Sequence, residues 1–292
     1  MIPATFEYLR AHTTDEALAQ LQRHGAEARV LAGGQSLIPA MRFRLARPAV
    51  LVDINSLNDL NYLRISDHVL AVGAIARDSD IERAPWIGER RWSLLHDVSR
   101  VVADPVVRQM GTIVGSLCHN DPAGDWTAVA IASGASVVVR GAAGTRRIPI
   151  DEFLVDSFAT AVGEGEMALA AEFPVPDDRT AGSYQKVERK VGDFATAAAA
   201  VQVSLNADGT IRTAGVALSA AGPTAVRVDE AERLLEKQKP TAALIQAAAD
   251  AASKRSVPQA DQRGGVDYKK HLAGVLVARG LRQALGRLGV QA

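Results

Sequence analysis

The chain has 292 residues, of which 48% are hydrophobic, and its 33 basic and 33 acidic side chains give a formal net charge of zero. A chain of this length can bury a sizeable core and is expected to form two domains, while the balanced charge argues against a nucleic-acid or anionic membrane surface as partner. The single cysteine, Cys118, excludes an internal disulfide and cannot supply the set of thiolates that an iron–sulfur cluster needs.

The first residues lack the basic region, apolar core and small-residue cleavage site of a signal peptide. No apolar run approaches the roughly 18 residues that a membrane-spanning helix requires. We therefore expect a cytoplasmic protein without a transmembrane segment.

The first elements predict a β-α-β lobe. Thr13 and Glu16 have the spacing of a capping box, so a helix is expected to begin there and to end at Gly25. Three elements should follow: a strand at 29–31, a helix at about 37–44, and a buried strand at 50–54.

The middle of the chain changes to short strands and helices. The pattern predicts a strand at 69–74, a helical region at about 92–98, a helix at about 126–132 and a strand at 136–140. Two prolines and two acids in 173–178 argue against continued regular structure and indicate a domain boundary.

Beyond that boundary we expect antiparallel strands and helices. Residues 201–205 alternate apolar and polar, 206–209 supply turn chemistry, and 211–218 return as the second strand of a hairpin. Alanines 197–200 favour helix by propensity, but they run directly into the alternating strand and are assigned to it. Helices are predicted at 229–238, 241–252 and 268–288.

A glycine pair marks the first candidate site. The strand at 29–31 runs into Ala32, Gly33, Gly34, Gln35 and Ser36, and then into the helix that begins near Leu37. Glycine lets the main chain approach a ligand closely, and a serine at this place can cap the helix or donate to an anionic oxygen. The segment therefore indicates a phosphate site, with a purely structural turn as the alternative.

A second segment repeats this composition in Thr112, Ile113, Val114, Gly115 and Ser116, and is predicted to form a second loop. Two such loops could grip one extended diphosphate. Neither fits Gly-x-Gly-x-x-Gly or the Walker phosphate loop, which argues against a Rossmann dinucleotide domain or a kinase.

Other chemistries find little support in the residues. The six histidines show no paired spacing typical of zinc ligands, and Ser116 lacks a credible His and acid partner for covalent hydrolysis. A divalent metal at Asp121 and Asp125 is disfavoured by Pro122 and by the absence of a third acidic cluster. We therefore expect neither a metal site nor covalent hydrolysis.

Taken together and in this order, the two segments resemble the FAD-binding medium subunits of the molybdenum hydroxylase (xanthine dehydrogenase) family. The family's first loop reads Ala-Gly-Gly-(Gln/His)-Ser-Leu, which residues 32–37 match, and its second reads Thr-Ile-Gly-Gly-Asn, from which Val114 and Ser116 depart. An Asp-Pro-x-x-Asp segment follows at 121–125. The resemblance extends over almost the whole chain, including 2–8, 103–108 and 182–195, and is to the carbon monoxide dehydrogenase type of medium subunit.

The resemblance implies an α+β fold: a two-lobed FAD-binding domain of the vanillyl-alcohol-oxidase-like (PCMH) type at 1–176, with lobes at about 1–56 and 57–176, and a smaller domain of antiparallel strands and helices at 177–292. It places FAD against both glycine segments. It also implies that Asp125 accepts hydrogen bonds from sugar or ribityl hydroxyls, with a helix N-cap as the alternative, and that Lys186 reaches the flavin, with a solvated lysine as the alternative. His119 could line the flavin or sit in a turn, and Asp193 could orient Lys186 or Arg189 or contact the ligand.

The implied function is electron relay, in which this chain has no catalytic residues of its own. A large molybdopterin subunit would oxidise the substrate, two [2Fe-2S] clusters on a small subunit would carry the electrons, and the FAD of this chain would pass them to an external acceptor in an (αβγ)2 assembly. The substrate and the acceptor, whether quinone, NAD or oxygen, stay open. Two alternatives remain: a stand-alone flavin reductase of the enolpyruvyl-UDP-sugar reductase type, and a scaffold subunit without FAD, for which Val114 is the hint.

Overall fold

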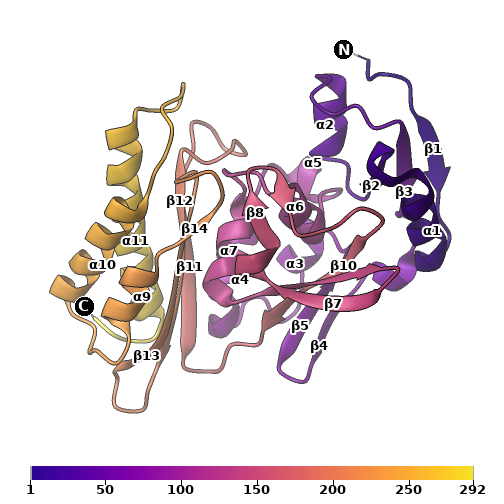
Figure 1. Ribbon diagram of the computed structural model, residues 1–292. Coiled ribbons are helices and arrows are strands. Elements are labelled where there is room, and N and C mark those ends of the chain that lie inside the picture. Colours follow the sequence, from indigo (N-terminus) through magenta and orange to yellow (C-terminus); the bar gives the residue numbers. More distant parts are fainter. Residues whose placement is uncertain (1, 292) are drawn as a thin grey trace.

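The computed structural model describes residues 2–291 and contains sheets of three, five, four and two strands with helices between and around them (Figure 1). The two ends of the chain lie on opposite sides of the molecule. This mixed helix and sheet architecture confirms the predicted α+β class. None of the helices within residues 2–291 combines the length and the apolar character that crossing a membrane demands.

The first lobe is a parallel sheet in the order β1-β3-β2, with the expected β-α-β unit inside it. The first helix of the lobe precedes that unit. It begins after Thr13, whose hydroxyl accepts a hydrogen bond from the backbone N–H of Glu16 at 3.1 Å, and it ends at Gly25, where φ is +51°. The strand β1 was not predicted. The elements are β1 (Glu7–Arg10), α1 (Thr14–His24), β2 (Ala28–Leu31), α2 (Leu37–Arg42) and β3 (Val50–Asp53).

The second lobe is built on an antiparallel sheet in the order β4-β5-β10-β6-β7. Its central strand runs through Pro174, two residues into the segment 173–178, and the absence of regular structure expected there holds from Val175 to Asp178. Proline lacks an N–H but is tolerated because it is the last residue of that strand. The strands are β4 (Leu63–Ser66), β5 (Val69–Gly73), β6 (Ser136–Gly141), β7 (Gly144–Pro149) and β10 (Met167–Pro174), with a hairpin of β8 (Leu154–Asp156) and β9 (Ala159–Thr160) beside them.

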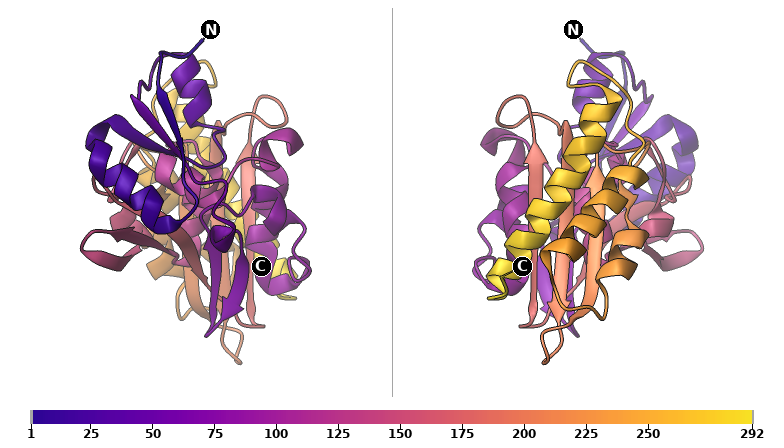
Figure 2. Two further views of the ribbon diagram at one scale, coloured as in Figure 1. Left: turned by 90° about the vertical axis from the view of Figure 1, so that its right-hand side faces the viewer. Right: turned by 90° about the vertical axis from the view of Figure 1, so that its left-hand side faces the viewer.

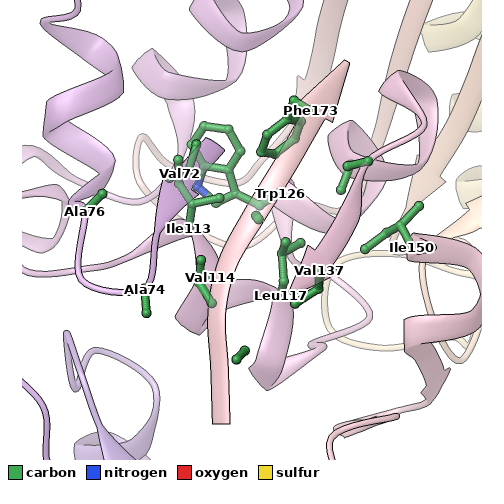
Figure 3. Close-up of a cluster of buried hydrophobic side chains, with 14 of the residues drawn as sticks. Val72, Ala74, Ala76, Ile113, Val114, Leu117, Trp126, Val137, Ile150 and Phe173 are labelled. Atoms are coloured by element: carbon green, nitrogen blue, oxygen red, sulfur yellow. The ribbon is translucent and has the colours of Figure 1, made fainter. Parts of the chain in front are cut away.

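Short helices pack against this sheet and carry the second glycine segment. The large buried side chains of Trp126, Phe173 and Leu117 form the centre of the core between helices and sheet (Figure 3). The helices are α3 (Asp78–Glu82), α4 (Ser93–Val101), α5 (Pro105–Arg108), α6 (Ile113–His119), α7 (Asp125–Ser133) and α8 (Ile150–Phe153).

The last part of the chain is an antiparallel sheet in the order β11-β12-β13-β14, and helices cover both of its faces (Figures 1 and 2). Ala198 and Ala200 face the core shared with α4 and α7, whereas Ala197 and Ala199 face the helices of the outer layer. The strand assignment of these alanines and the predicted hairpin are confirmed. The elements are β11 (Thr180–Val187), β12 (Ala197–Leu205), β13 (Ile211–Ser219), β14 (Val226–Arg227), α9 (Asp229–Leu235), α10 (Ala242–Arg255) and α11 (Val266–Arg287).

Candidate flavin site

The first glycine segment connects β2 to α2 and touches the second segment directly. A Cβ added to Gly33 would lie 2.2 Å from the backbone carbonyl oxygen of Met110, so only glycine allows this approach. Gly34 has a φ of +72°, in the left-handed region that favours glycine. Both glycines are therefore required by the backbone, and the structure brings the two predicted segments together.

Ser36 does not cap the helix that follows it. It occupies the N-cap position of α2, but its φ of −105° and ψ of −46° are helical and its hydroxyl makes no capping hydrogen bond. This aspect of the sequence prediction is wrong, because a capping serine needs an extended backbone to reach the first turn. Within residues 2–291, the backbone N–H groups of Gly34, Gln35 and Ser36 also have no recorded protein acceptor. These donors and the hydroxyl remain for a ligand.

The second segment is the start of a helix, where a loop was expected. Thr112 caps α6, its hydroxyl accepting from the backbone N–H of Gly115 at 3.1 Å, and Ser116 lies within the first turns. The side chains of Ile113 and Val114 are 0% and 2% exposed and point into the core (Figure 3). Val114 can therefore contribute only backbone to a ligand, and its side chain serves packing.

A network of hydrogen bonds between polar side chains, which the sequence analysis missed, joins the two segments. The side-chain amide of Asn55 donates to the carbonyl of Ala32 at 2.9 Å, and its oxygen accepts from Arg77 at 2.7 Å. The other end of the Arg77 guanidinium donates to the carbonyl of Met110 at 2.7 Å. Arg77 also pairs with Thr112 through an isolated β-bridge, so one residue holds the second segment by both side chain and backbone.

The carboxylate of Asp53, at the end of β3, connects this hydrogen-bond network to the first sheet. It accepts hydrogen bonds from the hydroxyl of Tyr8 and from the side-chain amide of Asn55, the latter at 2.6 Å. Although burial opposes it, these hydrogen bonds lower the pKa of Asp53, so the carboxylate stays ionised and holds Asn55 in one orientation. No local pattern marks Asn55 or Arg77, since the hydrogen bonds by which they join the two segments span 22 or more residues.

Asp125 and Lys186, the two other predicted site residues, lie against each other. The ammonium of Lys186 donates to Asp125 at 3.0 Å and to the carbonyl of Val101 at 3.1 Å. It also lies 3.2 Å from the carboxylate of Glu188, without hydrogen-bond geometry. The second oxygen of Asp125 accepts from the hydroxyl of Tyr184 at 2.6 Å.

This cluster is buried, and protein groups engage both oxygens of Asp125. The side chains of Lys186 and Asp125 are only 4% and 7% exposed, so the alternative of a solvated lysine is wrong. Burial raises the pKa of Asp125, while Lys186 and the hydroxyl of Tyr184 oppose the rise. Gly124 holds the N-cap position of α7 and Asp125 begins the helix, so the N-cap alternative is also wrong. A contact of Asp125 or Lys186 with the flavin stays a prediction.

The two remaining candidates lie in distinct surroundings. Asp193 accepts from Arg263 at 2.9 Å and from Arg189 at 3.2 Å, and these contacts, with Arg263 foremost, lower its pKa to about 2. It therefore orients Arg189, one of the two roles considered for it. His119 is the last residue of α6, with its ring 5.2 Å from that of Phe158, and burial lowers its pKa.

The donors at the two segments fit a diphosphate. Free backbone N–H groups in the first segment, the hydroxyls of Ser36 and Ser116 and the guanidinium of Arg77 are all donors, and a diphosphate offers only acceptors. FAD is such a molecule, with its diphosphate between adenosine and the flavin.

Comparisons with known proteins agree with this geometry. The family model described as the FAD binding domain in molybdopterin dehydrogenase matches residues 4–176, and the model described as the CO dehydrogenase flavoprotein C-terminal domain matches residues 182–284. The chain is 37% identical to the carbon monoxide dehydrogenase medium chain of Hydrogenophaga pseudoflava, over 98% of this chain and 99% of that one. It is 33% identical to the 6-hydroxypseudooxynicotine dehydrogenase complex subunit alpha of Paenarthrobacter nicotinovorans, over 98% of this chain and 97% of that one.

A solved structure of carbon monoxide dehydrogenase from Hydrogenophaga pseudoflava superposes with a TM-score of 0.95 at 38% identity, covering 98% of this chain and 99% of that one. The fold, the two glycine segments that lie together and the matches to known proteins define this chain as an FAD-binding subunit of an oxidoreductase. The chain belongs to the family of FAD-binding medium subunits of molybdenum hydroxylases, as the sequence resemblance indicated.

Proposed function

We propose that FAD binds between the two lobes with its diphosphate against the two glycine segments. The contact of Gly33 with Met110 supports this most directly, because it makes one continuous surface from segments that are far apart in the sequence. The proposed contacts are Ala32, Gly33, Gly34, Gln35, Ser36, Leu37, Thr112, Ile113, Val114, Gly115, Ser116, Asp125 and Lys186. We also propose a division into an FAD-binding domain at 1–176 and a C-terminal domain at 177–292.

Bound FAD supplies the redox chemistry, and the protein binds and orients it. We propose that the chain receives electrons from [2Fe-2S] clusters on a small subunit and delivers them to an external acceptor. A large molybdopterin subunit would hold the substrate site, in a cytoplasmic (αβγ)2 complex. The name "medium chain" of the relative from Hydrogenophaga pseudoflava supports an assembly with larger and smaller chains.

Carbon monoxide is the first substrate to test, because the relative at 37% identity is a carbon monoxide dehydrogenase chain. The relative at 33% identity belongs to a 6-hydroxypseudooxynicotine dehydrogenase complex, so membership of the family is compatible with other substrates. On the proposed assignment the substrate never contacts this chain. Its residues therefore carry no direct information on substrate choice.

Purification of the native complex tests the proposal through its visible spectrum, its metal content and the flavin released on denaturation. FAD together with iron and molybdenum would support the relay. A complex with both metals but without flavin would indicate that this chain is a scaffold subunit. FAD on a lone, metal-free chain that turns over substrate would favour a stand-alone flavin reductase. Assays of the intact complex with carbon monoxide and with hydroxylated pyridines would then separate the substrates.

A further inference from the structure

Arg77 lies where the two glycine segments meet and contacts both sides. It reaches the first segment through Asn55, whose amide holds the carbonyl of Ala32, and it binds the carbonyl of Met110, directly before the second segment. Met110 is also the residue that Gly33 touches. The guanidinium therefore fixes the distance between the two segments through planar donors that point in two directions.

The positive charge of Arg77 is not matched by a contacting carboxylate. Within residues 2–291 its guanidinium makes no recorded ion pair, and Asp80 binds its backbone N–H rather than its side chain. Burial lowers the pKa of Arg77, although the carboxylates of Asp80, Asp53 and Asp78, none of which binds the guanidinium, favour its charged form. A half-buried cation with two recorded side-chain hydrogen bonds and five N–H donors retains donors for an anion.

We propose that Arg77 is a positioning residue for FAD, which sets the spacing of the two glycine segments and offsets part of the diphosphate charge. Asn55 connects Arg77 to the first segment. This inference rests on the proposed function, since it assigns the diphosphate to this junction. It adds a cation to the two glycine segments, whose own donors are neutral N–H and hydroxyl groups.

The test is FAD affinity of the full chain after removal of its flavin, measured by flavin fluorescence over a series of salt concentrations. Arg77→Gln should weaken FAD binding on the order of tenfold, the scale of one hydrogen bond to a charged group, and should flatten the salt dependence. Arg77→Lys should restore the salt dependence but not the full affinity, because a single ammonium cannot bridge Asn55 and Met110 in the same way. Asn55→Ala should weaken binding while the salt dependence stays.

Arg64→Gln is the matched control, since Arg64 is exposed and its guanidinium stacks on the ring of Tyr62, 4.9 Å from its centroid. It should leave FAD affinity within about twofold of wild type. The inference is overturned if Arg77→Gln binds FAD as tightly as this control, or weakens binding without changing its salt dependence. If Arg77→Gln does not fold, the inference is overturned when Arg77→Lys and Asn55→Ala both bind FAD as tightly as this control. Failure of the wild-type chain itself to bind FAD would instead overturn the proposed function.

Discussion

Lys186 on β11 and Asp125 at the start of α7 form an ion pair with an Nζ–Oδ2 distance of 3.0 Å, which joins the last sheet of the chain to the helices of the second lobe. The carbonyl of Val101, at the end of α4, binds the same ammonium. One lysine therefore holds three elements together. A lysine in this arrangement contributes to the structure whether or not it also contacts the flavin.

Replacement of Lys186 by Met should strongly destabilise the protein. The change leaves the carboxylates of Asp125 and Glu188 buried without their cation, and removing one partner of a buried pair costs about 3–5 kcal/mol. Urea unfolding at neutral pH measures the loss. Lys190→Met, at an exposed position of the following loop, should change the free energy of unfolding by less than about 0.5 kcal/mol. If Lys186→Met keeps its stability but loses flavin, the lysine acts on the cofactor instead.

Gly33→Ala should reduce FAD affinity by on the order of tenfold or more, because the new Cβ would lie 2.2 Å from the carbonyl oxygen of Met110 and must push the two segments apart. Flavin content per purified chain and FAD titration of the flavin-free chain measure the effect. Gly88→Ala is the control, as nothing lies within 4 Å of its Cβ position. Equal flavin content in the two variants would show that the segments are not held at a critical spacing.

The first segment could be predicted from the sequence because all of its determinants are local. An apolar strand, two glycines and a helix start occur within about a dozen residues, and the structure places β2, the turn and α2 where expected. The strand at Ala197–Ala200 could also be predicted from the sequence, since the alternation of apolar and polar residues that follows outweighs the helical preference of alanine.

The second segment was misread because tertiary burial makes its helix. Ile113, Val114 and Gly115 have low helix propensity, and the local pattern therefore suggests a loop. The side chains of Ile113, Val114 and Leu117 fill the core between Trp126 and the central sheet, and that packing stabilises α6 (Figure 3). The hydrogen bonds by which Arg77 joins the two segments could not be predicted from the sequence for a related reason, since the partners of its guanidinium are 22 and 33 residues away.

Val114→Gly should destabilise the protein without tightening FAD binding. The valine side chain is buried in the core, so its removal loses about 2 kcal/mol of burial, and glycine in a helix loses about 1 kcal/mol more. Thermal unfolding and FAD titration on the same preparations separate the two effects. Val155→Gly, at an exposed position of the β8–β9 hairpin, controls for loss of a surface valine. A Val114→Gly protein that binds FAD much more tightly would show that the valine obstructs the site.

Asp78→Asn should change how stability depends on pH. Asp78 is 4% exposed, accepts a hydrogen bond from the indole of Trp126 at 2.9 Å, and lies against Gly111. Burial raises its pKa to about 7, although Trp126, Arg108 and Arg77 oppose the rise. The folded protein therefore keeps a proton on Asp78 that the unfolded chain releases near pH 4. As a result, this residue makes stability fall as pH rises from about 4 to about 7, by at most about 4 kcal/mol, with no further change above that range.

Asparagine cannot ionise, so the stability of Asp78→Asn relative to wild type should increase from pH 5 to pH 8, with most of the gain below pH 7. Urea unfolding of both proteins at each pH measures this difference. Asp59→Asn, which alters an exposed carboxylate, should follow the wild-type curve. Parallel curves for wild type and Asp78→Asn would mean that Asp78 is ionised in the folded protein throughout this range. In that case Arg77 and Arg108 would dominate over burial in setting its charge.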